Sequence, residues 1–518
     1  MALGACGGDS NDNAGPQEPQ RGGVFRIGSS IPFSSGLDPH LEQGAGLGVI
    51  PRLYGYLLHV DPRDDTVIYD QAESVEQPDD TTYLISMRDG VRFHNAEPAD
   101  GAPVTAHDAA ASIARFRYNP VAVAKLWHAT LLDTAEALSD RTLRVTTTRP
   151  YVYSLAELGN INAGVIIPRS LIDADISLFD TAAGSGPFAL VEAAPADRVT
   201  LARFDGYYRA PIPYLDGMEW RVFASTEDTL TALVRDEVDV AGARSRAEAN
   251  SLADQYEDIE AAATPSLAWL SIGFRMDRPP LADERVRGAI DLALDRDALV
   301  RDLLAGDGRA VGPVNPVLGD GFWSFSDEEL RAMRGGESTM GERIAAASAL
   351  LVAAGAENAS FSLQVADEQP LVAAAEAVRA QIEQTGLTVR IEKVDLLQWY
   401  NNLQAGAFEA SLISHLPYET PDRPLRFYHS AGPDGVANPF AFADGSVDAA
   451  IERSWGERDR DLRRDAILDA QRIGMRGRPI LQLFTGMTFS AARSRVQNRK
   501  PELYGSLAQY NYDQWLDD

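Results

Sequence analysis

The sequence predicts an α/β protein built from more than one domain. Residues 361–365 and 387–394 have the composition of strands, and the segment between them has helical periodicity. A strand, a helix and a strand in this order imply a parallel strand pair with a right-handed crossover. The length of 518 residues exceeds what one hydrophobic core usually serves, so we expect two to four domains.

The helix of this unit has an apolar stripe, and the strand that follows it alternates apolar and polar residues. Both patterns are those of elements packed on one face. The stripe consists of Leu371, Ala375, Val378 and Ile382, and the apolar positions of the strand are Leu387, Val389 and Ile391.

Other segments continue the mixture of strands and helices. A helix is expected over residues 105–118, where Thr105 is a candidate N-cap and Asp108 follows three residues later. One further helix is expected from residue 283 to Gly306, because apolar residues recur there at helical spacing. Strands are expected within residues 22–31, 80–93, 141–148 and 408–413, with two more within 184–208.

The charge excludes some partners. The chain has 76 Asp and Glu against 47 Lys and Arg, a formal net charge of −29. Such a surface repels phosphate backbones and anionic lipid, so we expect no nucleic-acid partner. The sequence also lacks an apolar run of the roughly 20 residues that a membrane-spanning helix needs.

The cysteine and histidine content argues against a metal or cofactor site. Cys6 is the single cysteine, so neither an internal disulfide nor a multi-cysteine metal site can form. The seven histidines include no pair at the i, i+4 spacing of a helical zinc site. We expect neither a metal nor a cofactor.

The N-terminal residues resemble a lipoprotein start. Leu3, Gly4, Ala5 and Cys6 fit the lipobox of bacterial lipoproteins, in which the cysteine is lipidated. Residues 1–22 are too polar to fold and suit a flexible tether. Only five residues precede Cys6, fewer than a signal peptide has, so we expect a trimmed or misassigned start.

The segment that follows the strand at 408–413 is the first candidate site. Ligands bind beyond the carboxyl ends of strands in open α/β sheets, which places residues 415–422 at a pocket. A catalytic alternative is that His415 acts with Ser414 and with Glu419 or Asp422 in a secreted hydrolase. The sequence has no nucleophile elbow or phosphate-binding glycine motif in the right context, so a binding loop is preferred.

Several motifs in order resemble the family 5 extracytoplasmic solute-binding proteins of ABC importers, the peptide, dipeptide and nickel type. The resemblance runs from about residue 23 to 515. It rests on "LDPH" at 37–40, "VRFHNAEPADGAPVTAHDAAASIARFR" at 91–117, "GSGPFALVEAAPADRVTLARFDGYYRAPIPYLD" at 184–216, "EDTLTALVRDEVDVAG" at 227–242 and "RPPLADERVRGAIDLALDRDALVRDLLAGDG" at 278–308.

The resemblance implies a two-lobed periplasmic-binding-protein-like fold, class II, with a hinge between the lobes and an extra subdomain in lobe one. Hinge closure is how such folds sequester a ligand. Carried over to this chain, lobe one comprises 23–57, 181–270 and 482–518, the extra subdomain 58–180, and lobe two 271–481.

In peptide-binding members, an acid in the loop after the "G-x-F-D" strand pairs with the α-ammonium of the ligand. Residues 406–409 match the start of that strand. An ungapped count places His415 at a tryptophan position and Tyr418 at the acid. One inserted residue places Glu419 there and aligns Asp422 with a later Pro-Asp, and this register is preferred because it keeps a carboxylate.

The other expected wall residues come from both lobes. The resemblance places the loop before Leu-Asp-Pro and two hinge strands at the ligand. Trp323 is a weaker candidate of the same kind, as is Trp399. The full expected set of ligand contacts is Phe33, Ser34, Ser35, Trp269, Trp399, His415, Leu416, Pro417, Tyr418, Glu419, Asp422 and Phe484.

The function implied by the resemblance is capture of a solute for an ABC permease, without making or breaking a bond. The expected ligand is a short peptide or another small amine-bearing compound. A sugar, an opine-like compound or a metal chelate is the alternative within the family. The expected protein is a monomer outside the cytoplasm, lipid-anchored at Cys6. A sensor subunit for a membrane receptor would share the same fold.

Overall fold

The computed structural model describes residues 18–42, 44–118, 130–336, 338–415, 417–432, 438–500 and 512–517. Within these residues the largest sheet has eleven strands, ordered β10-β11-β12-β1-β13-β19-β14-β18-β16-β17 with β15 beside β19. They are β1 (Val24–Ser29), β10 (Phe188–Ala194), β11 (Arg198–Arg203), β12 (Gly217–Val222), β13 (Val240–Ala243), β14 (Ile259–Phe274), β15 (Gly308–Ala310), β16 (Ser360–Ala366), β17 (Thr388–Val394), β18 (Ala410–His415) and β19 (Ile480–Arg493).

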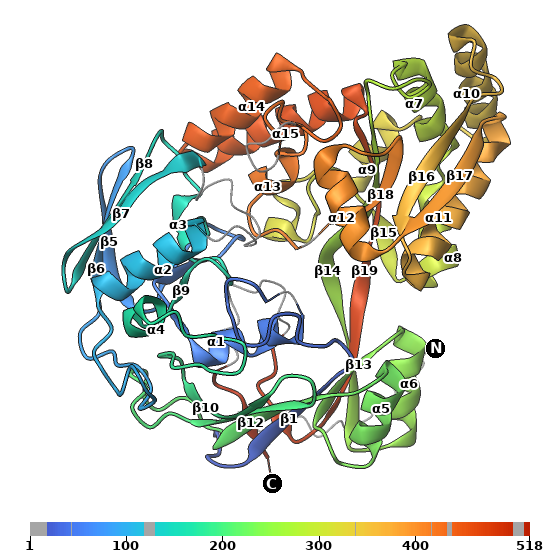
Figure 1. Ribbon diagram of the computed structural model, residues 1–518. Coiled ribbons are helices and arrows are strands. Elements are labelled where there is room, and N and C mark those ends of the chain that lie inside the picture. The colour runs from blue at the N-terminus through green and yellow to red at the C-terminus, as the bar shows by residue number, and fades with distance from the viewer. Residues whose placement is uncertain are drawn as a thin grey trace, which may run out of the picture.

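Two long antiparallel strands, β14 and β19, join the two halves of this sheet (Figure 1). One half, with β1 and β10–β13, is called lobe one, and the other, with β16–β18, is called lobe two. β19 pairs with β13 in lobe one, and β14 pairs with β18 in lobe two. The predicted α/β fold with two lobes is confirmed. The register between β14 and β19 is irregular from Pro265 to Ser271. This segment includes the boundary between the lobes that we expect between residues 270 and 271, and that boundary stays a prediction.

Helices flank both lobes, and the predicted strand–helix–strand unit of lobe two is present. β16 and β17 are parallel, and Ala375, Val378 and Ile382 of α11 are fully buried in the core of lobe two. Burial of the Val378 and Ile382 side chains contributes roughly 1.5–3 kcal/mol each. The flanking helices are α5 (Thr226–Val234) and α6 (Arg246–Gln255) in lobe one, and α7 (Glu284–Ala293), α8 (Arg296–Leu304), α9 (Asp327–Met333), α10 (Met340–Ala354), α11 (Gln369–Ile382) and α12 (Leu396–Ala405) in lobe two.

The single helix predicted from residue 283 to Gly306 is wrong, because the chain forms α7 and α8 with a break between them. Leu294 and Asp295 leave the helical region, with ψ of 111° and 91°. The Asp295 carboxylate accepts a 2.9 Å hydrogen bond from the Ala298 amide and so caps α8. Aspartate favours such local bonds over a helix interior, which explains the break.

The described part of residues 58–180 is called the subdomain, and it contains a separate antiparallel sheet in the order β5-β6-β8-β7. The helix predicted over 105–118 is α2, where the Asp108 carboxylate accepts hydrogen bonds from the Thr105 amide and hydroxyl at 2.9 and 2.7 Å. The elements are β3 (Leu58–Val60), β4 (Val67–Tyr69), β5 (Ala72–Asp79), β6 (Thr82–Met87), α2 (Ala106–Tyr118), β7 (Leu132–Ser139), β8 (Thr142–Thr147), α3 (Ser154–Leu158), β9 (Val165–Ile166) and α4 (Arg169–Asp173).

Three helices near the C-terminal end, α13–α15, reach from lobe two to the subdomain (Figure 1). The Val152 amide donates to the Trp455 carbonyl at 2.7 Å, which ties the segment before α3 to α14. The remaining elements are α1 (Ile50–Leu53), β2 (Gly55–Tyr56), α13 (Asp422–Leu425), α14 (Gly445–Gly456), α15 (Arg460–Gly477), β20 (Val496–Gln497) and β21 (Trp515–Leu516).

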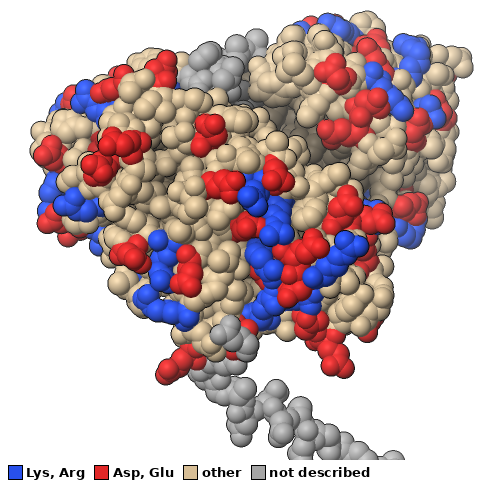
Figure 2. Space-filling model, turned by 60° about the horizontal axis from the view of Figure 1, so that its bottom comes forward, with Lys and Arg blue, Asp and Glu red and all other residues tan. Residues whose placement is uncertain are grey.

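Acidic and basic side chains are interleaved on the face of the molecule shown in Figure 2. In lobe one, Arg26 and Arg495 pair with Asp236 and Asp239, and Arg26 is 2.9 Å from each carboxylate. The acid excess therefore does not gather into one patch on this face. Over the described ranges, no helix combines the length and the apolar character needed to cross a membrane.

Candidate functional site

The predicted loop begins with an aromatic cluster at the end of β18. His415 pairs in register with Trp269 of β14, and their rings stack at 4.5 Å between centroids and 8° between planes. Tyr418 and Phe427 add edge contacts, Tyr418 to Trp269 at 5.6 Å and Phe427 to His415 at 5.2 Å. The structure thus brings together three predicted contacts, Trp269, His415 and Tyr418. Phe427 was missed, since nothing local in the sequence connects it to His415.

His415 is a buried, neutral histidine. Its Nε2 lies 2.7 Å from the Ser271 hydroxyl, and burial lowers its pKa to about 3. No described carboxylate lies within hydrogen-bonding distance of the ring. Ser414 is exposed on the opposite face of the strand, where successive side chains alternate. The serine, histidine and acid arrangement of the hydrolase alternative is therefore not assembled among these residues.

We expect His415 to make the protein less stable in mild acid. The unfolded chain takes up a proton near pH 6.5 and the folded chain only near pH 3, so stability is lost as pH falls between them. Between these two pH values, the free energy of unfolding falls by up to about 1.4 kcal/mol for each pH unit of acidification. A His415→Phe variant keeps an aromatic ring but cannot titrate. In urea unfolding between pH 6.5 and 5 it should lose less stability than wild type, and parallel pH dependences would contradict this.

Beyond the aromatic cluster, the loop lines a pocket of about 260 Å³, called the cleft pocket. Glu419, Thr420 and Pro421 form one wall, together with Trp323 and residues from the start of α15 and the end of α14. The subdomain forms the other wall, which includes Tyr83, Tyr151 and Tyr153. The pocket thus lies between the subdomain on one side and Trp323, the loop after β18 and the α14–α15 segment on the other.

Polar groups in the cleft pocket have unused bonding capacity. The hydroxyls of Tyr153 and Thr420 and the indole nitrogen of Trp323 are buried with no hydrogen-bond partner in the described residues. A buried polar group without a partner costs roughly 1–3 kcal/mol, which a ligand can recover. Burial raises the pKa of Tyr56 well above its usual range, and Glu419 is one of the charges that add to the shift.

Asp422 lies in a buried ion-pair network and not on the wall of the cleft pocket. Its side chain has no exposed surface, and Oδ2 accepts from Tyr151 (2.9 Å), Trp455 (3.0 Å) and Arg426 (2.9 and 3.1 Å). Oδ1 is buried without a partner in the described residues. The carboxylate thus holds α13 to α14 and to the subdomain.

Glu157 of α3 completes this network from the subdomain side. It pairs with Arg423 and, at 3.0 Å, with Arg426. Exposed ion pairs surround it, Arg149 with Glu452 at 3.1 Å and Arg458 with Asp80 at 2.8 Å. The subdomain and α13–α15 are therefore held together by two buried acids, two buried arginines and a rim of surface pairs.

The predicted loop of lobe one is organised by a residue that the sequence reading missed. The Glu42 carboxylate is fully buried and accepts backbone hydrogen bonds from Ser34 (3.1 Å), Ser35 (2.5 Å), Gly44 (2.7 Å) and Gly46 (3.2 Å). The Ser34 hydroxyl also donates to Glu42. Phe33 is buried in the core. The loop is thus fixed internally, and its contact with a ligand stays a prediction.

Other predicted contacts lie in different surroundings. Trp399 is buried beside β18, where its indole nitrogen donates to the Ser411 hydroxyl at 3.1 Å and the Leu412 carbonyl at 3.2 Å. Phe484 belongs to the buried core of lobe two. Pro417 is exposed. Leu416, and the proposed lipidation site Cys6, lie outside the described residues.

Comparison with known proteins agrees with this architecture. The family described as "Bacterial extracellular solute-binding proteins, family 5 Middle" matches residues 66–438. A protein of Pectobacterium atrosepticum named glutathione-binding protein GsiB is 25% identical over 299 residues, which are 57% of this chain and 55% of that protein. The chain thus spans about half the length of such relatives.

Two solved structures share the fold over nearly the whole chain. The periplasmic binding protein DppA of Helicobacter pylori, in complex with the peptide STSA, has a TM-score of 0.79 at 19% identity, covering 96% of this chain and 99% of that one. MoaA of A. tumefaciens R10, in complex with mannopinic acid, has a TM-score of 0.77 at 21% identity, covering 96% and 100%. With the family match over residues 66–438, the chain belongs to the bacterial extracellular solute-binding proteins of family 5.

Proposed function

We propose that this chain is the substrate-binding component of an ABC importer. It captures a short peptide or another small amine-bearing solute between its lobes and delivers it to the membrane permease. The observation that carries this proposal is the cleft pocket, where Glu419 stands beside tyrosine and tryptophan side chains. A carboxylate forms a charge-assisted hydrogen bond to an ammonium, and aromatic side chains beside it also attract a cation.

The anchor that we propose is Glu419 and not Tyr418. Glu419 lines the cleft pocket, whereas the Tyr418 ring packs edge-on against Trp269. The hydroxyls of Tyr153 and Thr420 supply further hydrogen bonds to the peptide groups of the ligand. The volume of about 260 Å³ is just below that of sites for drug-sized ligands, roughly 300–1,000 Å³, and suits a ligand of two or three residues.

We propose that solute capture involves hinge closure at β14 and β19. The proposed lobe limits are those expected from the sequence: 23–57, 181–270 and 482–518 for lobe one with the subdomain at 58–180, and 271–481 for lobe two. The irregular register from Pro265 to Ser271 supports a hinge there, because fewer ladder bonds resist bending. The ion pairs between the subdomain and α13–α15 would hold the closed arrangement.

The partners that we propose are the permease, and a membrane surface through a lipid on Cys6. The protein would act as a monomer outside the cytoplasm and would make or break no bond. A sugar, an opine-like compound or a metal chelate is the alternative ligand class. We retain this alternative because the structure of MoaA, which has the same fold, is a complex with mannopinic acid. One fold can carry binding sites for different ligands.

Native mass spectrometry of the purified chain tests this function. We expect a bound solute below about 1 kDa that is lost on mild denaturation, because a concave site with several hydrogen-bonding groups favours retention of its ligand. A peptide, or another compound with a free amine, supports the proposal. A single amine-free compound would overturn the amine-bearing class and favour the alternative ligand class.

A further inference from the structure

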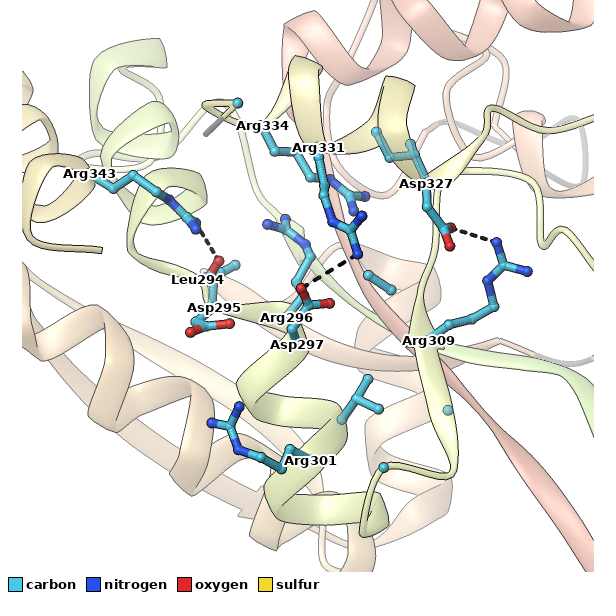
Figure 3. Close-up of a pocket in the computed structure, with 16 residues that line it drawn as sticks. Leu294, Asp295, Arg296, Asp297, Arg301, Arg309, Asp327, Arg331, Arg334 and Arg343 are labelled. Carbon is cyan, nitrogen blue, oxygen red and sulfur yellow. Dashed lines mark hydrogen bonds and ion pairs between the residues drawn. The ribbon is translucent and has the colours of Figure 1, made fainter. Parts of the chain in front are cut away.

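A second pocket, on lobe two, is rich in arginine (Figure 3). It has a volume of about 390 Å³ and shares no lining residue with the cleft pocket. Residues of α8, β15 and α9 line it, together with one arginine of α10. In a chain with 29 more acids than bases, a pocket with twice as many arginines as aspartates is unusual. The six arginines of this arginine pocket are Arg296, Arg301, Arg309, Arg331, Arg334 and Arg343.

Two of the three aspartates of the arginine pocket pair with its more exposed arginines, and the third caps a helix. Asp327 pairs with Arg309 at 2.5 Å, and the exposed Asp297 lies 3.9 Å from Arg331. The third, Asp295, uses its carboxylate to cap α8. These acids therefore do not neutralise the arginines deeper in the pocket.

Two of the deeper guanidinium groups have no acidic partner. Arg334 donates to the Val311 carbonyl at 2.5 Å, and Arg343 donates to the Leu294 carbonyl at 2.6 Å. No carboxylate of the described residues lies within ion-pair distance of either. The Nε of Arg343 is buried without a hydrogen-bond partner. Both side chains thus keep N–H donors that the described residues do not use.

The buried Arg296 adds to this positive field. It pairs with Asp291 at 2.7 Å, but Asp291 is also 3.3 Å from Arg478 and so is shared between two cations. Burial, and after it the charge of Arg296, lower the pKa of Arg334 to about 9. Burial and then Arg296 also lower the pKa of Arg343. The arginines remain charged at neutral pH and repel one another, which an anion would relieve.

We propose that the arginine pocket binds a small oxyanion, with a phosphate group as the best fit. Arg296, Arg331 and Arg334 extend toward one another across the pocket (Figure 3). Planar guanidinium groups donate paired N–H bonds to tetrahedral or planar oxyanions, and a dianion gains most where several cations meet. The proposal does not rest on the solute site at Glu419, so the two can fail separately.

Titration calorimetry of the full chain with inorganic phosphate, at neutral pH and low ionic strength, tests the site. We expect saturable binding with a dissociation constant below about 1 mM, since several charge-assisted bonds form at once. Arg334→Gln and Arg343→Gln should each weaken it at least about tenfold. Arg453→Gln removes an exposed arginine paired with Asp469 and should leave it unchanged, as should Glu419→Gln.

Three results would overturn the proposal. The first is the absence of saturable heat up to about 10 mM phosphate. The second is phosphate binding by both pocket variants with the affinity of wild type. The third is a loss of affinity in Arg453→Gln as large as that in the pocket variants. If one pocket variant does not fold, the other decides, because Arg334 and Arg343 lie on different segments. Methyl phosphate and succinate, titrated in parallel, distinguish a phosphomonoester from a dicarboxylate as the ligand.

Discussion

An Asp422→Ala variant should lose about 3–5 kcal/mol of its free energy of unfolding, because removing one partner leaves an uncompensated buried charge. In the wild type, Asp422 and Glu157 balance Arg423 and Arg426, and all four side chains are at most 11% exposed. Alanine leaves one positive charge unbalanced. It also leaves the Trp455 indole N–H without its acceptor, and the Tyr151 hydroxyl keeps only its longer bond to Glu157 at 3.4 Å.

Urea unfolding, followed by tryptophan fluorescence and circular dichroism, measures this loss. The matched control is Asp173→Ala, which removes an exposed acid paired with Arg169 on α4 and should cost below about 1 kcal/mol. A similar small cost for Asp422→Ala would contradict the view that the network holds the subdomain to α13–α15.

A Glu419→Gln variant should bind an amine-bearing solute about 100-fold more weakly than wild type. Glutamine keeps the size of the side chain but removes the charge that pairs with the ammonium. Losing one partner of such a desolvated pair costs about 2–5 kcal/mol, and 100-fold corresponds to about 2.7 kcal/mol. Glu419 is only half-buried, so the fold should tolerate the change.

The matched control for this variant is Glu376→Gln, which changes the same residue type on α11, where the acid pairs with the exposed Arg379. Its affinity should stay within about twofold of wild type, because Glu376 does not line the cleft pocket and distant sites couple by only about 0.3–0.5 kcal/mol. Equal losses in the two variants would mean that the effect is one of overall charge and not of a specific anchor.

Local patterns allowed much of the fold to be predicted. The unit β16–α11–β17 follows from periodicity within single segments, as does the start of α2. The break between α7 and α8 was missed because apolar spacing continues across it, whereas the deciding event is the hydrogen bond from the Ala298 amide to Asp295. A competing local bond of this kind leaves the hydrophobic period unchanged.

The site could be predicted only in part. The position of the loop after β18 follows from one strand end, and its role in ligand binding stays a prediction. The Trp269–His415 stack was not predicted, because it depends on the pairing of β14 with β18, which lie far apart in the sequence. The role of Asp422 was not accessible, since one of its partners, Tyr151, lies 271 residues away in the sequence. Tyr153 was missed as a pocket residue because it lies far in the sequence from Glu419 and Thr420, which line the same pocket.

The central claim is that Glu419 anchors an amine in the cleft pocket. Calorimetric titration of glutathione and of the tripeptide Ser-Thr-Ser, each with a free and an acetylated N-terminus, tests it most directly. At least one of the free peptides should bind the wild-type protein, and acetylation should weaken its binding about 100-fold. In Glu419→Gln, acetylation should change the affinity by less than about threefold. Equal binding of free and acetylated ligands to wild type, or no binding of either peptide, would contradict the claim.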